Sequence, residues 1–387
     1  MKKITFILVS CFVSLAFFAH GQYNTINTAV PFLGISPSTR GASMGDIGVA
    51  TPLDPSSAYW NPAKLMMADN YSGVTVSHAP WMPALIEGLS LTSVYAYLAP
   101  FEADQTIQMF GAGLRYFSHG DVQYMDINGA EVGTYRPADI ALDLTYSRQI
   151  GDAEGIGLTF RVISSSLGSS NVYADHSTVK KGMAFAVDLG YFKSITMGER
   201  ESNSLAFGAT LQNLGSKLKY TTDGAGTFLP TTLKLGTNYV IGNDPGAVIY
   251  SVGVELNKLL VPSPPIYDEN RQIIAGKDPR VPMMKGITQS FYDAPGGLKE
   301  ELNEIQLSFG AEAAFHDHYF LRGGLSYESE FKGNRSYGTI GLGYKMNLSS
   351  NQVQFDGGYV MPFDPHSPLK NSFRFSISVF IDKQNGY

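Results

Sequence analysis

Residues Gly34–Leu65 read GISPSTRGASMGDIGVATPLDPSSAYWNPAKL, a stretch that precedes any strand-like run and has no periodicity of its own. It is rich in glycine, serine and proline, and small residues allow a backbone to pack closely against its surroundings. A linker exposed to water would not need Met44, Ile47 and Trp60. We therefore predict that this stretch forms a compact plug and that the remaining chain forms the wall around it.

The start of the chain has the features of a secretory signal peptide over residues 1–21. Lys2 and Lys3 give a charged start, Ile4–Phe18 is apolar, and Ala19-His20-Gly21 places small residues before the expected cleavage site. The mature chain is then expected to begin at Gln22. We expect three parts, which are the signal peptide (1–21), an N-terminal segment with the lumenal plug (22–69) and a transmembrane β-barrel (70–387).

The composition excludes several classes of protein. Cys11 is the only cysteine and lies in the expected signal peptide, so neither disulfides nor cysteine-based metal sites are expected. The net charge of −6 is mild and no basic cluster suggests a nucleic-acid partner. Charged residues make up only 16% of the chain and aromatic residues 12%, whereas soluble chains average about 25% charged residues. This balance favours a β-rich protein with lipid on one side.

A period of two recurs along the chain after the plug. In Gly182–Phe192, large apolar residues alternate with small or polar ones, which predicts a strand. No later apolar run reaches the roughly 18 residues of a transmembrane helix. The runs with this alternation are Asn70–His78, Leu89–Leu98, Ile107–Phe117, Asp139–Gln149, Gly155–Ser165, Gly182–Phe192, Ser204–Asn213, Thr232–Ile241, Ala247–Asn257, Glu304–Phe315, Tyr319–Glu328, Tyr337–Leu348, Gln352–Met361 and Ser372–Ile381.

The connections between these runs alternate between short and long. Short periplasmic turns and long extracellular loops are typical of outer-membrane barrels, whereas a soluble sandwich has no reason to sort its loops in this way. We therefore predict an all-β fold, a 14-stranded antiparallel transmembrane barrel with loops at the cell surface. The short connections include Gln149–Gly155, Ile241–Ala247, His316–His318 and Leu348–Gln352, and the long ones include Ala79–Gly88, Ser118–Ala138, Ser166–Gly182, Leu214–Thr231, Lys258–Asn303 and Pro362–Asn371.

The charged residues of the strands fall on the face opposite the large apolar ones. A charge on the lipid face would cost about 2–4 kcal/mol near the midplane, so this placement supports the predicted register. An open ion pore often carries an excess of one sign, whereas acids and bases are balanced here. We expect them to pair with each other and with the plug inside a closed lumen. They are Arg115, Asp143, Arg161, Asp188, Lys234, Glu255, Glu312, Arg322, Asp356 and Arg374.

The plug carries a family resemblance. Gly34, Arg40-Gly41, Met44-Gly45, Asp54 and Asn61-Pro62-Ala63 resemble the N-terminal pattern of the FadL-like outer-membrane proteins, which implies fourteen strands and an N-terminal hatch. Within that group, the runs over residues 24–35, 40–50 and 60–64 resemble the PorV family of the type IX secretion system. The plug residues that carry the prediction are Arg40, Met44, Gly45, Trp60, Asn61, Pro62 and Ala63.

The resemblance implies a role in protein secretion through the outer membrane of a Gram-negative, Bacteroidetes-type cell. PorV-like proteins are implied to bind the C-terminal domain of secreted cargo and to dock at a SprA-like translocon barrel. They would then pass the cargo to a PorU-like sortase complex. The implied partners are these proteins and outer-membrane lipid.

Three loops are candidate binding surfaces, of which Pro362–Asn371 is the weaker one, and the other two also have a plain structural explanation. The loop Ala79–Gly88 is either an interaction hook or part of an interfacial aromatic belt that packs over the barrel mouth. The loop Lys258–Asn303, with a predicted short helix at Leu298–Leu302, is either a docking element or a lid on its own barrel. The candidate contact residues are Trp81, Met82, Leu85, Ile86, Val281, Met283, Met284 and Phe363.

Inside the plug, Asn61 and Asp54 either cap turns, which we favour, or bind a ligand. Arg40 is expected to pair with a wall carboxylate such as Asp143 or Asp188.

Two other function classes remain open at this point. A FadL-type transporter of hydrophobic small molecules would share the barrel and the plug but would need an apolar pocket near the hatch. A surface enzyme would need a converged catalytic triad, and no zinc-protease or serine-hydrolase motif is present. We expect neither catalytic residues nor a cofactor or metal. The loop groups weighed were His119 with Asp121, His176 with Asp175 and Ser177, and His316 with Asp317 and His318.

Overall fold

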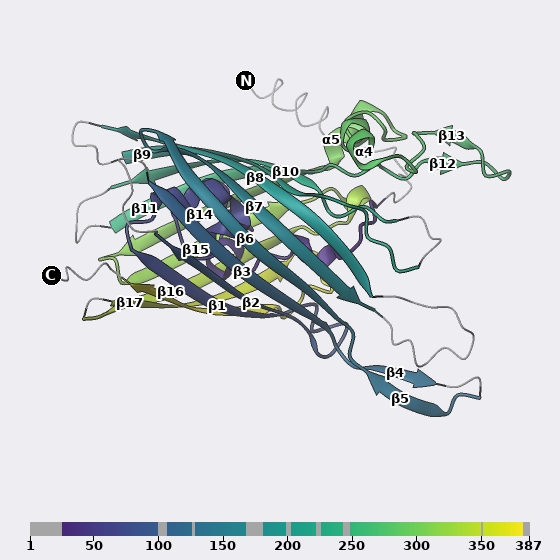
Figure 1. Ribbon diagram of the computed structural model, residues 1–387, viewed down its shortest axis with the longest axis horizontal. Coiled ribbons are helices and arrows are strands. Elements are labelled where there is room, and N and C mark those ends of the chain that lie inside the picture. The colour runs from purple at the N-terminus through teal and green to yellow at the C-terminus, as the bar shows by residue number, and fades with distance from the viewer. Residues whose placement is uncertain are drawn as a thin grey trace, which may run out of the picture.

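The computed structural model describes residues 25–99, 107–125, 128–167, 181–198, 203–221, 226–242, 248–349 and 351–381. The expected signal peptide and the group around His176 lie outside these residues. The described strands form a closed antiparallel barrel of fourteen, which confirms the predicted fold (Figure 1). Strand β1 pairs with β18 to close the ring, with Val74 opposite Val379. None of the described helices is long and apolar enough to cross a membrane.

The barrel strands follow the predicted runs closely. Their ends differ from the predicted ones by up to five residues, because ladder pairing rather than side-chain alternation sets where a strand stops. In order around the ring they are β1 (Ser72–Pro80), β2 (Leu89–Leu98), β3 (Gln108–His119), β6 (Ala138–Gly151), β7 (Glu154–Ser166), β8 (Gly182–Met197), β9 (Asn203–Gly215), β10 (Thr232–Ile241), β11 (Val248–Leu259), β14 (Ile305–Phe315), β15 (Tyr319–Tyr327), β16 (Tyr337–Leu348), β17 (Asn351–Pro362) and β18 (Phe373–Ile381).

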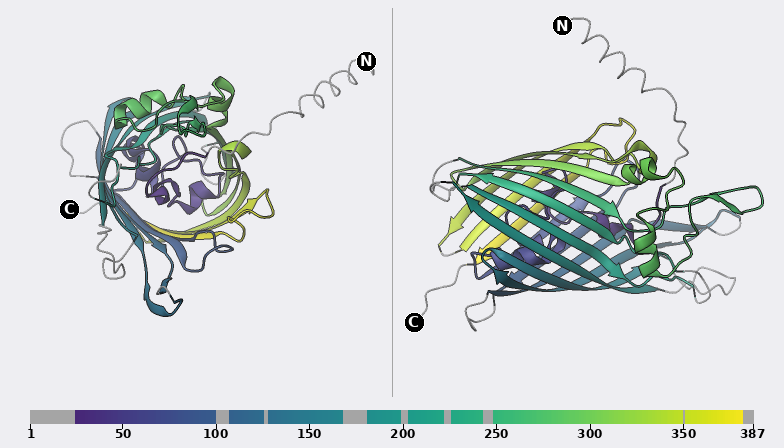
Figure 2. Two further views of the ribbon diagram at one scale, coloured as in Figure 1. Left: turned by 90° about the vertical axis from the view of Figure 1, so that its right-hand side faces the viewer. Right: turned by 90° about the horizontal axis from the view of Figure 1, so that it is seen from above.

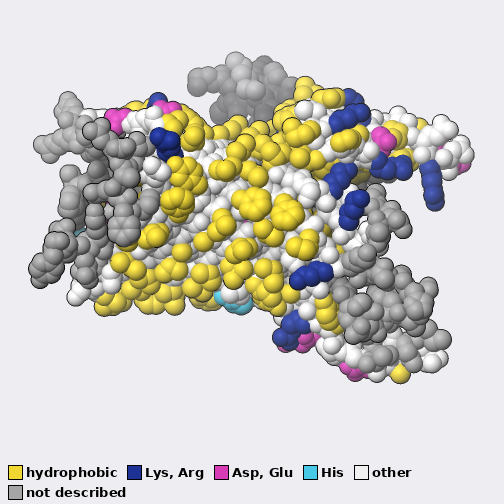
Figure 3. Space-filling model, viewed as in Figure 1, with side chains coloured by type: hydrophobic (Ala, Val, Ile, Leu, Met, Phe, Trp, Pro, Cys, Tyr) yellow, Lys and Arg dark blue, Asp and Glu magenta, His cyan; other side chains and the backbone are white. Residues whose placement is uncertain are grey.

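The side chains alternate as the sequence predicts. On β8, Met183 is 58% exposed and Phe185 52% exposed, whereas Ala184, Ala186 and Asp188 are buried. Hydrophobic side chains spread over the outer wall in Figure 3. Each of the ten predicted inward charges is buried or, for Lys234, nearly so. The predicted register is therefore confirmed.

The two ends of the barrel differ in their connections. The end at the left of Figure 1 carries short turns, such as the three residues between β14 and β15. The opposite end, here called the loop end, carries the long connections and the smaller elements within them. These are β4 (Val122–Met125), β5 (Glu131–Tyr135), β12 (Ile266–Tyr267), β13 (Ile273–Ala275), α4 (Met283–Gln289), α5 (Leu298–Asn303) and η3 (Glu330–Lys332).

The described residues before β1 lie inside the ring of strands (Figure 2). We call residues 25–68 the lumenal segment. Its short helices are η1 (Pro31–Gly34), α2 (Thr39–Ala42), α3 (Ser57–Trp60) and η2 (Pro62–Met67). The segment runs from the loop end, where Ala29 N–H donates to Phe228 O, toward the end with the short turns, where β1 begins.

Glycines on the inner wall let the lumenal segment approach the strands closely. A Cβ on Gly324 would lie 2.2 Å from Gly45 N and from Met44 C. Gly45 itself has a φ of +72°, and a Cβ there would lie 2.6 Å from Leu325 O. Both positions therefore need glycine, one for space and the other also for its backbone conformation.

Gly324→Ala is expected to displace the lumenal segment and to lower stability by about 1–3 kcal/mol, the usual cost of overpacking. The matched control is Gly323→Ala, because a Cβ on Gly323 meets no atom closer than Thr339 O at 3.8 Å. Stability is measured as the temperature at which the folded band on a cold-loaded SDS gel converts to the unfolded one. Equal temperatures for the two variants would contradict the close packing described above.

Candidate functional site

The lumen contains a buried ion-pair group on the β6–β8 side. Arg161 donates to Asp143 at 2.7 Å and lies 2.8 Å from Asp188. Arg115 lies 3.4 Å from Asp143 and donates to Leu33 O of the lumenal segment at 3.1 Å. Buried charges are tolerated only when paired and hydrogen-bonded. This group therefore links four strands, β3, β6, β7 and β8, to the lumenal segment.

A second group joins Arg40 to the opposite wall. Arg40 donates to both oxygens of Glu312, at 2.6 and 2.9 Å, and Arg322 donates to the same carboxylate at 2.5 Å. The expectation that Arg40 pairs with a wall carboxylate is confirmed, but the partner is Glu312 and neither of the two examples named, since Asp143 and Asp188 already neutralise Arg161. The alternation along each strand predicts which side chains point into the lumen. It does not predict which of them the lumenal segment meets.

Asn61 makes the turn-capping contacts that we favoured. Its Oδ1 accepts from Ala63 N–H at the start of η2, and its Nδ2 donates to Val49 O and to Tyr191 O. Asp54 likewise accepts from Ser56 N–H at 2.8 Å. Asn61 and Asp54 therefore stabilise turns of the lumenal segment.

The lumenal segment also contacts both strands of the closing seam. Arg374 on β18 donates to Ser36 O at 3.0 Å, and Ser77 on β1 donates to Pro37 O at 2.5 Å. Two adjacent residues of one segment thus join the first and the last strand of the barrel.

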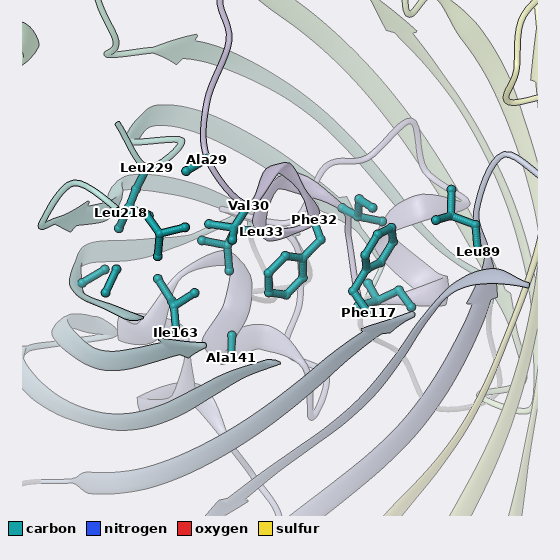
Figure 4. Close-up of a cluster of buried hydrophobic side chains, with 14 residues drawn as sticks. Ala29, Val30, Phe32, Leu33, Leu89, Phe117, Ala141, Ile163, Leu218 and Leu229 are labelled. Carbon is teal, nitrogen blue, oxygen red and sulfur yellow. The ribbon is translucent and has the colours of Figure 1, made fainter. Parts of the chain in front are cut away.

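An apolar cluster packs the loop-end part of the lumenal segment against the wall. Figure 4 shows Phe32 facing Phe117, and their ring centroids lie 5.8 Å apart. Leu33, Ile163 and Leu229 belong to the same buried cluster. This cluster therefore combines side chains of the lumenal segment with the inner faces of five strands, β2, β3, β6, β7 and β8, and with the connection before β10.

Within the described residues, a cavity lies toward each end of the barrel. The cavity at the loop end has a volume of about 450 Å³ and the other about 520 Å³. Aromatic residues such as Trp60 and Trp81 line the loop-end cavity, and so do Lys332, Arg335 and Glu328. Its lining is therefore mixed, with charges of both signs beside the aromatic rings.

The predicted contact residues of the first loop divide into two groups. Trp81 and Met82 pack against buried clusters, and the Arg374 guanidinium lies 5.7 Å from the centre of the Trp81 ring. Leu85 is 65% exposed and Ile86 44% exposed. The loop therefore combines a packed base with an exposed apolar tip.

The predicted contact residues of the long loop also fall into two groups, one packed and one exposed. Val281 is buried beside Phe228, and Met283 packs against the same cluster. Met284 is 61% exposed, as is Phe363 in the last loop. Proximity in the sequence therefore did not predict which of these methionines is accessible.

The long loop is held on the barrel rim by ion pairs with Lys258 at the end of β11 and with Lys332 of η3. Lys258 lies 3.0 Å from Glu301 and 2.8 Å from Glu304. Lys332 lies 2.6 Å from Glu300 and 3.0 Å from Glu304. The predicted helix at 298–302 is confirmed as α5, and these pairs fix its position beside β14.

Sequence reasoning missed several exposed apolar side chains on the same loop. Phe291, Leu298 and Leu302 are exposed, with Leu298 the most exposed at 77%. The four-residue spacing of the two leucines indicated a helix, but an apolar pair with this spacing usually packs inward. The strand-facing side of α5 is instead taken by Glu301 and its partners.

Among the described residues, neither His119 nor His318 forms the group in which it was weighed as catalytic. His119 bonds to Asp139 rather than to Asp121, which pairs with Arg136. His318 bonds to the carbonyl of Lys345. Within the described parts of the chain, no three His, Cys, Asp or Glu residues come together as a metal site would require.

Asp293 is a buried carboxyl in the long loop. Burial raises the pKa of Asp293 to about 6, against the opposing hydrogen bonds from Gln289 and from Ser263 N–H. The nearby carboxyls of Glu301 and Glu304 add to the rise. A raised carboxyl pKa stabilises the folded loop below the unfolded pKa, and this contribution is lost as pH rises through the folded value.

We therefore expect the long loop to open more often at about pH 7.5 than at about pH 5, since Asp293 ionises in between. Hydrogen exchange of residues 283–297, corrected for the intrinsic effect of pH, measures the opening. Asp293→Asn should reduce the difference between the two pH values, and residues of β16 serve as an internal reference. An unchanged difference in the variant would assign the effect to other groups.

Comparison with known proteins identifies the family. The family model described as type IX secretion system protein PorV matches residues 18–266. No curated protein sequence matches the chain. Among solved structures, the toluene transporter TodX of Pseudomonas putida is similar at 12% identity and a TM-score of 0.46, over 93% of this chain and 98% of that chain. The toluene transporter TbuX of Ralstonia pickettii gives 10% identity, a TM-score of 0.45 and coverage of 89% and 96%.

A FadL homologue of Pseudomonas aeruginosa gives 11% identity, a TM-score of 0.43 and coverage of 93% and 100%. The family model covers more than half of the chain. The chain therefore belongs to the PorV family of type IX secretion system proteins.

Proposed function

We propose that this outer-membrane protein binds the C-terminal domain of secreted cargo at the loop end of its barrel. It takes the cargo from a SprA-like translocon and passes it to a PorU-like sortase complex at the surface of a Bacteroidetes-type cell. The PorV family match supports a place in type IX secretion, and the shuttling step is our extension of it.

The observation that carries the proposal is the exposed apolar tip at the loop end. Leu85 and Ile86 project from a loop whose base is fixed by Trp81 and Met82, and Phe363 is exposed on the last loop. Exposed apolar groups of this kind mark interaction sites. A fixed base also lowers the entropy lost when a partner binds.

The contents of the lumen weigh against solute transport. We propose that the lumenal segment acts as a plug, because Arg40, Arg115 and their wall partners tie it to both sides of the barrel. A hydrophobic molecule passing from end to end would have to displace these paired charges. The loop-end cavity is large enough for a small ligand, but Lys332, Arg335 and Glu328 line it.

The double variant Leu85→Ser, Ile86→Ser tests the proposal. It should reduce the cargo recovered with the tagged protein from outer membranes by about tenfold or more, because central apolar residues dominate interface energy. The matched control is Ile150→Ser, Leu348→Ser, since these side chains are 53% and 50% exposed near the short turns. Barrel assembly, measured by the gel shift, should be the same in both.

Cargo recovery that is equal in the two double variants would refute the role of the tip. Recovery of a fatty acid or aromatic hydrocarbon, with neither cargo nor translocon, would instead favour the transporter alternative.

A further inference from the structure

The helices α4 and α5 expose a group of apolar side chains that no packing within the described part of the chain covers. We call Met284, Phe291, Tyr292, Leu298 and Leu302 the rim patch. Their exposed fractions are 61%, 49%, 59%, 77% and 59%, respectively. The patch lies on two short helices and the turn between them, so it is separate from the tip of the first loop.

The rim patch lies over the barrel wall and not over the lumen. Figure 2 shows both helices on the perimeter of the ring when the barrel is seen from the loop end. In the view of Figure 3, hydrophobic side chains continue from the wall up to the region of α4 and α5. A lid on the barrel mouth would instead lie above the lumenal segment.

The apolar surface of α5 is continuous with the apolar outer surface of the neighbouring strands. Leu302 precedes Leu307 by five residues, and Leu307 is 45% exposed on the lipid-facing side of β14. Leu256 of β11 lies directly opposite Leu307 in the ladder and is 43% exposed. The apolar surface of α5 is therefore an extension of the barrel's lipid belt beyond the end of the strand.

Basic residues surround the rim patch. Lys277, Lys285 and Lys299 are exposed, and the Lys277 ammonium lies 3.6 Å from the centre of the Tyr292 ring. The acids nearby are engaged, since Asp278 pairs with Arg280 and Glu300 pairs with Lys332. An apolar face flanked by lysines, with a tyrosine at their boundary, is the composition of an element that lies in a membrane interface.

The ion pairs on the inner side of α5 fix which way the patch faces. Glu301 and Glu304 bind Lys258, and Glu301 also accepts the N–H groups of Asp293 and Ala294. The helix cannot turn its leucines inward without breaking this buried network, which is costly. The ion pairs therefore keep the leucines of α5 facing outward.

We propose that the rim patch lies in the headgroup region of the outer leaflet and that Lys277, Lys285 and Lys299 bind the phosphate groups of anionic lipids there. The partner is the lipid surface itself, because the patch continues a face that already contacts lipid. This interaction needs neither cargo nor translocon and stands apart from the proposed function.

The test uses a fluorescent nitrobenzoxadiazole probe on Leu298→Cys in the mature chain, in which Cys11 is absent if the signal peptide is removed as expected. The protein is reconstituted in vesicles of brominated phosphatidylcholine mixed equally with phosphatidylglycerol. The emission should shift to the blue and be quenched about twofold by the brominated chains, because an interfacial helix buries its apolar face about 5–10 Å deep. The control probe on Gln272→Cys sits on the exposed β12–β13 hairpin and should stay unquenched.

Substituting glutamine for Lys277, Lys285 and Lys299 tests the phosphate contacts. With the probe at 298, quenching should be stronger in the anionic vesicles than in pure phosphatidylcholine, and this difference should disappear in the triple variant. The gel shift verifies that each barrel is folded. Equal quenching of the 298 and 272 probes, or shielding of the 298 probe only after a protein partner is added, would overturn the proposal.

Discussion

The pairing of buried charges inside the barrel is the constraint on which the rest of the structure depends. A charge removed from water is tolerated only beside an opposite charge with its hydrogen bonds satisfied. Arg161 has its opposite charges in Asp143 and Asp188, and Arg322 has them in Glu312 and Asp356. Each such group spans neighbouring strands, so it fixes their register at the same time as it fills the lumen.

The same constraint positions the lumenal segment. Arg40 completes the charge balance around Glu312, and Glu255 on β11 accepts the N–H groups of Gly48 and Val49. Glycines such as Gly324 then allow the two backbones to come into contact. The ion pairs determine where the lumenal segment binds the wall. The glycines of the wall determine how closely the two backbones pack.

Much of this arrangement could be predicted from the sequence because it has a short period. Alternation at every second residue gives the strands, and it places Asp188 inside and Phe185 outside without any knowledge of the partner strand. The pairing of Arg40 with Glu312 could not be predicted, since these residues are far apart in sequence and any inward carboxylate was equally suitable. The exposure of Leu298 was missed for a related reason, because the surface that it extends is formed by strands, not by its own helix.

The contacts of Ser36 and Pro37 with the two seam strands bear on the order in which the barrel is made. Arg374 of β18 and Ser77 of β1 reach adjacent carbonyl groups of a segment that is covalently joined to β1. Because these contacts hold the segment inside the closed barrel, we expect it to be in place when the last strand meets the first. The segment would then act as a template for closure of the sheet. A chain that lacks it would lose the contacts that bring β1 and β18 together.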